Sequence, residues 1–275
     1  MIIDGRTIAS DILSSIRGRF DREVVVRAIT CAPSPATLSY LKIKEARAVE
    51  AGMKLEIITV PETASNEEVI EAIQKPGADA VIVQLPLPPH LSTEEILHTI
   101  PRAKDADVLS PGAYAAFVEG KDDAALPPVV CAVQEVLARS NVPLTGKRAV
   151  VVGQGKLVGR PVALWLEHEG VQVTVVTKED GNLHLLKDAD IVVSGAGHAG
   201  LITPELIREG VVLIDAGTSE QSGQMVGDAD PACAEKASVF TPVPGGVGPI
   251  AVACLFRNVA TLLERPLQEG EKVVH

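Results

Sequence analysis

A tyrosine and a lysine lie four residues apart in the stretch TLSYLKIKEARA, residues 37–48. If this stretch is helical, Tyr40 and Lys44 are neighbours on one helix face, whereas Lys42 points away from both. The ring and the ammonium can therefore act together. The alternative is that Lys44, like most lysines, is a solvated surface charge.

Two further polar residues lie at positions where they could take part in catalysis or ligand binding. Gln84 directly follows the aliphatic residues 81–83, and a polar side chain at the end of a buried strand needs hydrogen-bond partners. An amide oxygen placed beside the ammonium of Lys44 would form a pair able to handle a proton. Asp107, in AKDADVLS, is a loop carboxylate, for which a turn or a solvated position is the alternative.

A glycine-rich turn forms a second candidate site. Glycines at positions 153, 155 and 159 follow the aliphatic run AVVV and precede a helical pattern. Such glycines allow a tight turn and let a pyrophosphate approach the backbone at a helix amino terminus. This context favours dinucleotide binding over a merely structural turn. Farther on, Glu179 or Asp180 could bind a ribose diol and Lys178 a 2′-phosphate, which leaves NAD and NADP open.

Alternating strands and helices must position the first group of residues. Aliphatic runs at 24–30, 55–60 and 78–87 predict strands, and helical patterns separate them. The motifs SNEE and STEE fit the capping box and predict helices that begin near Ser65 and Ser92. Strand and helix in alternation predict a parallel sheet, in which ligands bind beyond the carboxyl ends of the strands.

The same alternation restarts in the second half of the chain. A loop predicted at 110–128 and a helix predicted at 129–140 precede it, and the segment PVPGGVGP follows it. That segment is either a turn or a backbone wall beside a flat ligand.

We therefore predict a two-lobed α/β fold. Residues 1–125 form an amino-terminal α/β substrate domain, on which a final helix at 250–275 packs back. Residues 126–249 form a Rossmann-like nucleotide domain with a doubly wound parallel sheet.

Composition limits the class of protein. A chain of 275 residues with 46% hydrophobic and 22% charged residues is globular with a sizeable core. Its net charge of −11 argues against nucleic-acid partners and against general attraction to membranes. The four cysteines form no CxxC pair and the six histidines show no ligand spacing, so no disulfide framework or metal site is predicted. With no signal segment or run of 18 apolar residues, we expect a cytoplasmic protein.

Nearly end to end, the chain resembles the bifunctional methylenetetrahydrofolate dehydrogenase/methenyltetrahydrofolate cyclohydrolases. The resemblance rests on IIDGRTIAS, SYLKIK, VQLPLPPH, KDAD, LTGKRAVVVGQGKLVGRP, LIDAG, VGDAD and TPVPGGVGP, in this order. It implies oxidation of 5,10-methylenetetrahydrofolate with NADP, NAD being possible, and hydrolysis of the methenyl product to 10-formyltetrahydrofolate. It also implies a homodimer.

The resemblance implies roles for individual residues. Tyr40 would stack on the pterin, Lys44 with Gln84 would manage proton transfer, and Asp107 would bind the amino-pyrimidine edge, so that Lys44, Gln84 and Asp107 are the implied catalytic residues. The implied substrate-binding residues are Tyr40, Lys44, Val83, Gln84, Leu85, Asp107, Pro244, Gly245, Gly246, Val247 and Gly248. The implied cofactor-binding residues are Gly153, Gln154, Gly155, Lys178 and Thr218.

Departures from the family pattern leave alternatives open. Val108 stands where the family usually has glycine, and Gln154 with Gly155 stands where it usually has arginine and serine. The latter change removes a natural partner of a 2′-phosphate. One alternative is a monofunctional dehydrogenase whose hydrolytic step is weakened by the altered loop. Another is a catalytically silent nucleotide-binding protein, against which the tyrosine, lysine and glutamine together argue.

Overall fold

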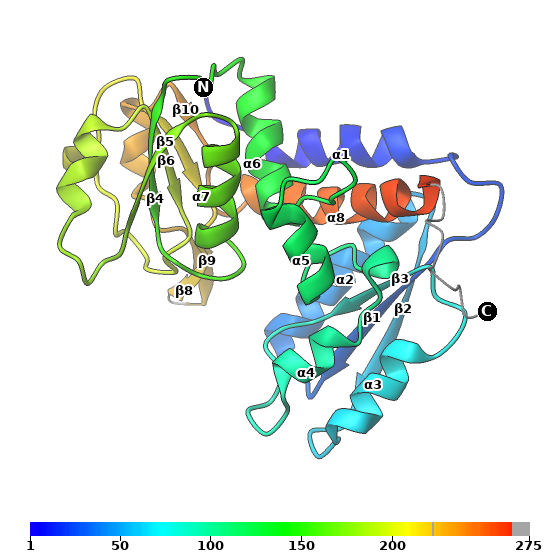
Figure 1. Ribbon diagram of the computed structural model, residues 1–275. Helices are drawn as coiled ribbons and strands as arrows, with labels where there is room; N and C mark the ends of the chain where they lie inside the picture. The colour runs from blue at the N-terminus through cyan, green and yellow to red at the C-terminus, as the bar shows by residue number, and fades with distance from the viewer. Residues whose placement is uncertain (222, 266–275) are drawn as a thin grey trace. The chain divides into compact units, whose positions relative to one another are not determined.

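A computed structural model describes residues 1–221 and 223–265 of the chain (Figure 1). The chain divides into two compact units. Unit 1 comprises Met1–Ala9 and Pro128–Cys254, and unit 2 comprises Ser10–Pro127 and the described part of Leu255–His275. The end of the predicted final helix, from residue 266 onward, lies outside the described residues.

Unit 2 is built on a three-stranded parallel sheet in the order β2-β1-β3. All four residues of β3 are buried, as expected for a parallel strand covered on both faces. The strands are β1 (Val25–Cys31), β2 (Lys54–Val60) and β3 (Ala80–Val83), and the helices are α2 (Pro35–Glu50), α3 (Asn66–Gln74), α4 (Thr93–His98), α5 (Pro111–Val118) and the 3₁₀ turn η1 (Arg102–Lys104).

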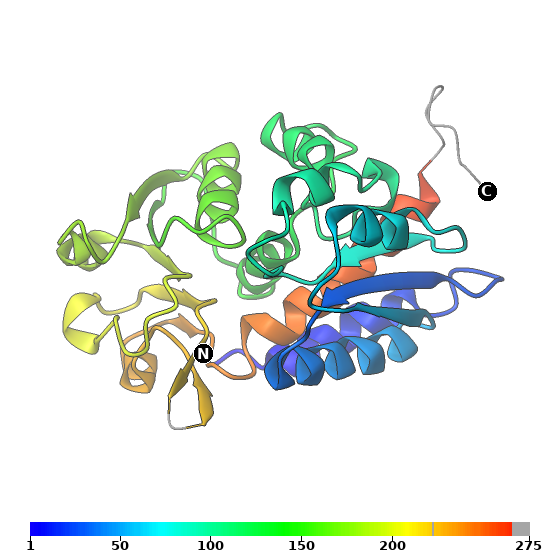
Figure 2. The ribbon, with the colours of Figure 1, turned by 90° about the horizontal axis from the view of Figure 1, so that it is seen from below.

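Helices cover both faces of this sheet. Ile29 and Val81 of the strands share one hydrophobic cluster with Ile73 of α3 and Ile96 of α4. Residues of α2 do not belong to that cluster, and Figure 2 shows α2 on the opposite face. Helix α2, which carries Tyr40 and Lys44, therefore covers the face of the sheet opposite α3 and α4.

The predicted helix starts are present, although their caps differ. Ser65 and Glu68 form a complete capping box at the start of α3. The Ser92 hydroxyl accepts the Glu95 N–H at 3.3 Å, but the Ser92 N–H donates to the Asn66 side chain at 3.0 Å. The second motif is therefore half of a capping box, completed by a residue of α3.

The loop predicted at 110–128 is wrong in part because it contains α5. The Ser110 side chain caps this helix by accepting the Ala113 N–H, and Pro111 occupies its first turn. Proline and glycine, which indicated a loop, are here compatible with a helix start. The amino-terminal helix α1 (Gly5–Ile16) was not predicted either.

Unit 1 contains a five-stranded parallel sheet in the order β10-β7-β6-β4-β5. The chain moves from β4 to β5 on one side and then crosses to β6 on the other, which confirms the predicted doubly wound fold. The strands are β4 (Arg148–Val152), β5 (Gln172–Val176), β6 (Ile191–Ser194), β7 (Val212–Asp215) and β10 (Val239–Phe240), with an antiparallel pair β8 (Ser219–Gln221) and β9 (Gln224–Val226). The helical segments are α6 (Pro128–Arg139), α7 (Gly159–His168), η2 (Leu183–Asp188), η3 (Pro204–Leu206) and η4 (Pro231–Glu235).

The chain termini do not follow the predicted domain limits. The Ile3 N–H donates to the Phe240 carbonyl at 2.8 Å, and the Phe240 N–H donates to the Met1 carbonyl at 2.9 Å. The first residues thus extend the sheet of unit 1, whereas the sequence placed them in the substrate domain.

Helix α8 (Val247–Glu264) passes from unit 1 to unit 2 after Cys254. Its Asn258 side chain donates to the carbonyls of Ala106 and Leu126, both of unit 2. Among the described helices, α8 alone is long and apolar enough to span a membrane, and 67% of that window is buried inside the fold. Burial of this kind is typical of a core helix.

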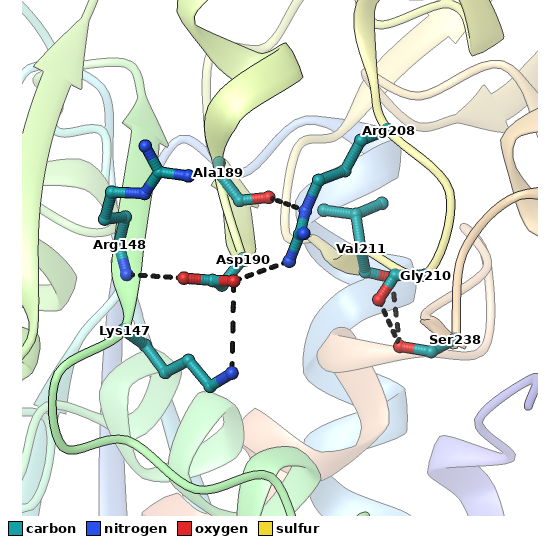
Figure 3. A network of polar contacts seen from close by, with 8 residues as sticks. All are labelled: Lys147, Arg148, Ala189, Asp190, Arg208, Gly210, Val211 and Ser238. Atoms are coloured by element: carbon teal, nitrogen blue, oxygen red, sulfur yellow. Dashed lines mark hydrogen bonds and ion pairs between the residues drawn. The ribbon is translucent and has the colours of Figure 1, made fainter.

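At the amino edge of the unit 1 sheet, one carboxylate joins several segments (Figure 3). Asp190 accepts the Arg148 N–H at 2.9 Å and lies 2.5 Å from the Arg208 guanidinium and 3.9 Å from the Lys147 ammonium. The Arg148 N–H, with the charges of Lys147 and Arg208, lowers the pKa of Asp190. Asp190 thus fixes the start of β6 to the start of β4.

We predict that Asp190→Asn lowers the free energy of unfolding by about 1 kcal/mol at pH 7, because a charge-assisted and partly exposed contact is lost. Since folding lowers this pKa, the contribution is present above the unfolded pKa, about 3.9, and disappears as the pH falls through the folded value. Urea unfolding at pH 7, 5 and 3 should show the difference between wild type and variant shrinking toward pH 3. A difference independent of pH would contradict this role.

Candidate functional site

In unit 2, the structure brings Lys44 and Gln84 together. The Lys44 side chain is 5% exposed, and its Nζ donates to Gln84 Oε1 at 3.1 Å. The Gln84 N–H continues the sheet ladder by donating to the Ile29 carbonyl at 2.8 Å, and its Nε2 donates to the Leu85 carbonyl at 3.1 Å. These bonds orient the amide so that its oxygen faces the ammonium.

Tyr40 completes the helix side of this group. The Lys44 Nζ lies 5.1 Å from the centroid of the Tyr40 ring, which is cation–π distance. Desolvation of the phenol, with a smaller effect from the Asp107 charge, raises the pKa of Tyr40 to about 12. The phenol therefore stays protonated near neutral pH, while 38% of the residue remains exposed.

Asp107 supplies a negative charge to the same region. Burial raises the pKa of its carboxyl, the charge of Asp105 raises it further, and Lys44 opposes the shift. Burial likewise lowers the pKa of Lys44, and Asp107 opposes that shift. Within residues 1–221 and 223–265, the Asp107 carboxylate makes no hydrogen bond, so its oxygens are available to a ligand.

The loop that carries Asp107 is held by a carboxylate that sequence reasoning missed. Asp105, which is buried, accepts the N–H groups of Leu109 at 3.2 Å and Ser110 at 2.6 Å. Val108, which lies between Asp105 and these two donors in the chain, adopts φ +58 and is only 2% exposed. This left-handed conformation is unfavourable for a β-branched residue and explains why a glycine suits the position. The Asp-x-Asp spacing in KDAD was the available signal for Asp105.

In unit 1, the glycine turn follows β4 as predicted. Gly153 has φ +105, and a Cβ added to it would meet the Gly195 carbonyl oxygen at 2.8 Å. A Cβ on Gly159 would overlap the Gly153 carbonyl, whereas one on Gly155 would meet nothing within 4 Å. Packing therefore requires two of the three glycines, and the third leaves the turn open at the carboxyl edge of the sheet.

The other predicted cofactor residues lie at the same edge. Gln154 follows β4, Lys178 follows β5 and Thr218 follows β7, and all three are exposed. The Asp180 carboxylate accepts the Thr177 N–H at 2.9 Å. Asp180 is thus engaged in its own turn, which weakens its case as a ribose ligand.

The glycine-rich segment Pro244–Gly248 belongs to unit 1, whereas Tyr40, Lys44, Gln84 and Asp107 belong to unit 2. The Gly5 N–H donates to the Gly245 carbonyl at 2.9 Å, and a Cβ on Gly5 would overlap the Gly246 carbonyl. This segment therefore has a structural role at the start of α1 whether or not it also faces a ligand.

The two residues beside Gln84 remain predictions as substrate contacts. Val83, the last residue of β3, is buried, and Leu85 is half-buried. Both belong to unit 2, with Gln84 between them. Neither side chain has a polar atom, so either could contribute only apolar contacts.

Comparison with known proteins gives matches over nearly the whole chain. The catalytic domain of tetrahydrofolate dehydrogenase/cyclohydrolase matches residues 3–107, and the NAD(P)-binding domain of the same family matches residues 127–267. A bifunctional protein FolD of Solibacter usitatus is 34% identical, with 96% of this chain and 97% of that protein covered.

Two solved structures are similar over their full length. The bifunctional FolD methylenetetrahydrofolate dehydrogenase/cyclohydrolase of Campylobacter jejuni has a TM-score of 0.91 at 30% identity, covering 95% of this chain and 98% of that one. The Trypanosoma brucei methylenetetrahydrofolate dehydrogenase-cyclohydrolase, complexed with NADP and an inhibitor, has a TM-score of 0.88 at 33% identity, covering 95% and 96%.

We predict that Val108→Gly is more stable than Val108→Ala by about 1 kcal/mol, because both lose the buried isopropyl group but only glycine relieves the left-handed strain. The matched control is Ala115→Gly in α5, where the same exchange should instead destabilise by about 1 kcal/mol. Urea unfolding of the variants measures both differences. An alanine variant as stable as the glycine variant would show that the loop adopts another conformation.

Proposed function

The chain belongs to the tetrahydrofolate dehydrogenase/cyclohydrolase family, and from this premise we propose that it is a bifunctional one-carbon folate enzyme. It oxidises 5,10-methylenetetrahydrofolate to the methenyl form with NAD(P) and hydrolyses that product to 10-formyltetrahydrofolate. The observation that carries the proposal is the 3.1 Å hydrogen bond between the buried Lys44 ammonium and Gln84.

The carboxyl edge of the unit 1 sheet fits a nicotinamide dinucleotide. Gly153 and Gly159 leave no room for a side chain and so keep the turn tight, while Gly155 leaves open space through which a phosphate could approach the backbone. Gln154 and Thr218 are exposed at the same edge. When bound, NAD(P) supplies the hydride acceptor, and the oxidation needs alignment but no protein acid or base.

Hydrolysis does require proton transfer, and Lys44 is suited to it. The attacking water must lose a proton, and a ring nitrogen must gain one when the methenyl bridge opens. Burial lowers the pKa of Lys44, so its amine is free to accept the water proton at a lower pH than an exposed lysine would be. Gln84 orients the amine, and Tyr40 offers a flat surface beside it. The open carboxylate of Asp107 is a suitable acceptor for an amino-pyrimidine edge.

The Lys44–Gln84 pair also argues against a monofunctional dehydrogenase. Oxidation alone gives no use for a buried ammonium, which is costly to desolvate. If the wild-type enzyme formed methenyltetrahydrofolate without hydrolysing it, the monofunctional alternative would hold.

We predict that Lys44→Met lowers methenyl hydrolysis by about 10²-fold or more and retains a measurable share of dehydrogenase activity, because only hydrolysis needs proton transfer. Decay of the absorbance of added methenyltetrahydrofolate without nucleotide measures hydrolysis, and formation of NAD(P)H from 5,10-methylenetetrahydrofolate and NAD(P) measures oxidation. Lys42→Met is the matched control, since Lys42 is exposed and points away from the site, and it should retain both activities. Equal loss of both activities in a folded Lys44 variant would mean that Lys44 mainly binds substrate.

For the cofactor, we propose that NADP is used with a smaller preference over NAD than a dedicated phosphate pocket would give. Lys178 is the exposed cation that follows β5, and Glu179 and Asp180 beside it repel a phosphate. Gln154 adds no charge. A single exposed lysine contributes only modest attraction once solvent screening is counted.

We predict that Lys178→Ala raises the Michaelis constant for NADP by about two- to fivefold and leaves that for NAD nearly unchanged, as expected for one exposed ion pair. Initial dehydrogenase rates with each nucleotide provide the measurement. Lys187→Ala, which removes another exposed lysine of unit 1, should alter neither constant. Equal changes with NADP and NAD would exclude Lys178 as the reader of the 2′-phosphate.

Two further expectations belong to the same proposal. All four cysteines are buried, and none of them forms a disulfide within the described residues, which supports a reducing, cytoplasmic location. A homodimer is expected from the family resemblance.

A further inference from the structure

Two short segments of unit 1, residues 215–217 and 227–229, are held together through their carboxylates. Asp215 accepts the Gly217 N–H at 2.9 Å and the Ala229 N–H at 2.8 Å. A Cβ on Gly217 would overlap the Asp228 carboxylate, and a Cβ on Gly227 would overlap the Asp215 carboxylate. Each segment therefore has a glycine where the other needs room for its acid, and neither can shift independently.

Asp228 also holds the loop that follows β6. Its side chain is fully buried and accepts the Ser194 hydroxyl at 2.6 Å and the N–H groups of Ala196 and His198 at 2.7 Å each. Three donors from one five-residue stretch converge on this carboxylate. The path of the loop is thus set by a residue that lies 30 to 34 positions farther along the chain than the three donors.

The loop held by Asp228 in turn supports the glycine turn. The Gly195 carbonyl lies against Gly153, and a Cβ on Gly195 would overlap the Val158 side chain. Val158 directly precedes α7. Because β4 and β6 are the strands between which the chain order reverses, this contact lies at the topological switch point, where doubly wound sheets bind ligands.

The arrangement has an electrostatic cost. Burial, with the nearby charge of Asp228, raises the pKa of Asp215 to about 6, although N–H donors oppose the rise. Two buried carboxylates repel each other. A costly acidic pair at the edge of a ligand-binding sheet is typical of a functional site.

We infer that Asp228 is a positioning residue for the nicotinamide dinucleotide: by fixing the loop after β6, it sets the glycine turn and the start of α7 against which the nucleotide binds. This inference rests on the proposed use of NAD(P). Because Asp228 is fully buried, it acts through the loop and does not contact the nucleotide itself.

Titration of the full-length protein with NADPH and with NADH, followed by nucleotide fluorescence, tests this role without turnover. Asp228→Asn should weaken nucleotide binding by about tenfold or more, because an amide cannot accept all three donors. Ser194→Ala removes one of the three bonds and should weaken binding by about two- to fourfold. If Asp228→Asn fails to fold, the Ser194 variant carries the test.

Asp190→Asn is the matched control, because Asp190 also accepts a backbone N–H in unit 1 but at the amino edge of the same sheet (Figure 3). It should lose stability yet bind NADPH within about twofold of wild type. Hydrolysis of methenyltetrahydrofolate without nucleotide should persist in the Ser194 and Asp228 variants.

Three outcomes would overturn the inference. In the first, the Ser194 and Asp228 variants both bind nucleotide as tightly as wild type. In the second, the Asp190 control weakens binding as much as they do, which would trace the effect to stability. Failure of the wild-type protein to bind either nucleotide would instead remove the proposed dehydrogenase function, and the inference with it.

Discussion

Parallel strand pairing gathers the carboxyl ends of all strands at one edge, and both candidate sites of this chain depend on that constraint. In unit 2, Val83 at the end of β3 is in register with Ile29 of β1, which places Gln84 at the edge beside α2. In unit 1, the glycine turn, the loop after β6 and Thr218 meet at one edge for the same reason. Each sheet thus brings residues that are far apart in the sequence together at one edge.

The pKa of Lys44 depends on its hydrogen-bond partner as well as on its burial. A neutral amide satisfies the ammonium without cancelling its charge, so desolvation prevails and the pKa of Lys44 falls. A carboxylate in direct contact would favour the protonated form and prevent the lysine from acting as a base. Asp107 is close enough to oppose the lowering of the Lys44 pKa but makes no hydrogen bond with Lys44 in the described part of the chain. The geometry therefore suits proton transfer better than a buried ion pair would.

Carboxylates that accept backbone N–H groups are the recurrent means of fixing loops in both units. Asp105 holds the loop of Asp107, Asp228 holds the loop beside the glycine turn, and Asp190 holds the start of β6. Each such bond satisfies a backbone donor in a loop or at the first residue of a strand. Gly217 and Gly227 leave room for these carboxylates, because a side chain at either position would displace the carboxylate of Asp228 or Asp215.

Local spacing in the sequence determined the Tyr40–Lys44 pair, the helix starts at Ser65 and Ser92, the glycine turn and the alternation that gives parallel sheets, because these features depend on neighbours within a few residues. It did not reveal α5, since Pro111 and the following glycine are equally compatible with a loop and with a capped first turn. The Lys44–Gln84 bond spans 40 residues, and the bond from Ser194 to Asp228 spans 34, so only strand order and helix packing could bring these groups together. Likewise, Val108 was visible as a departure, but its left-handed conformation follows from two hydrogen bonds to Asp105 that form only when the loop is folded.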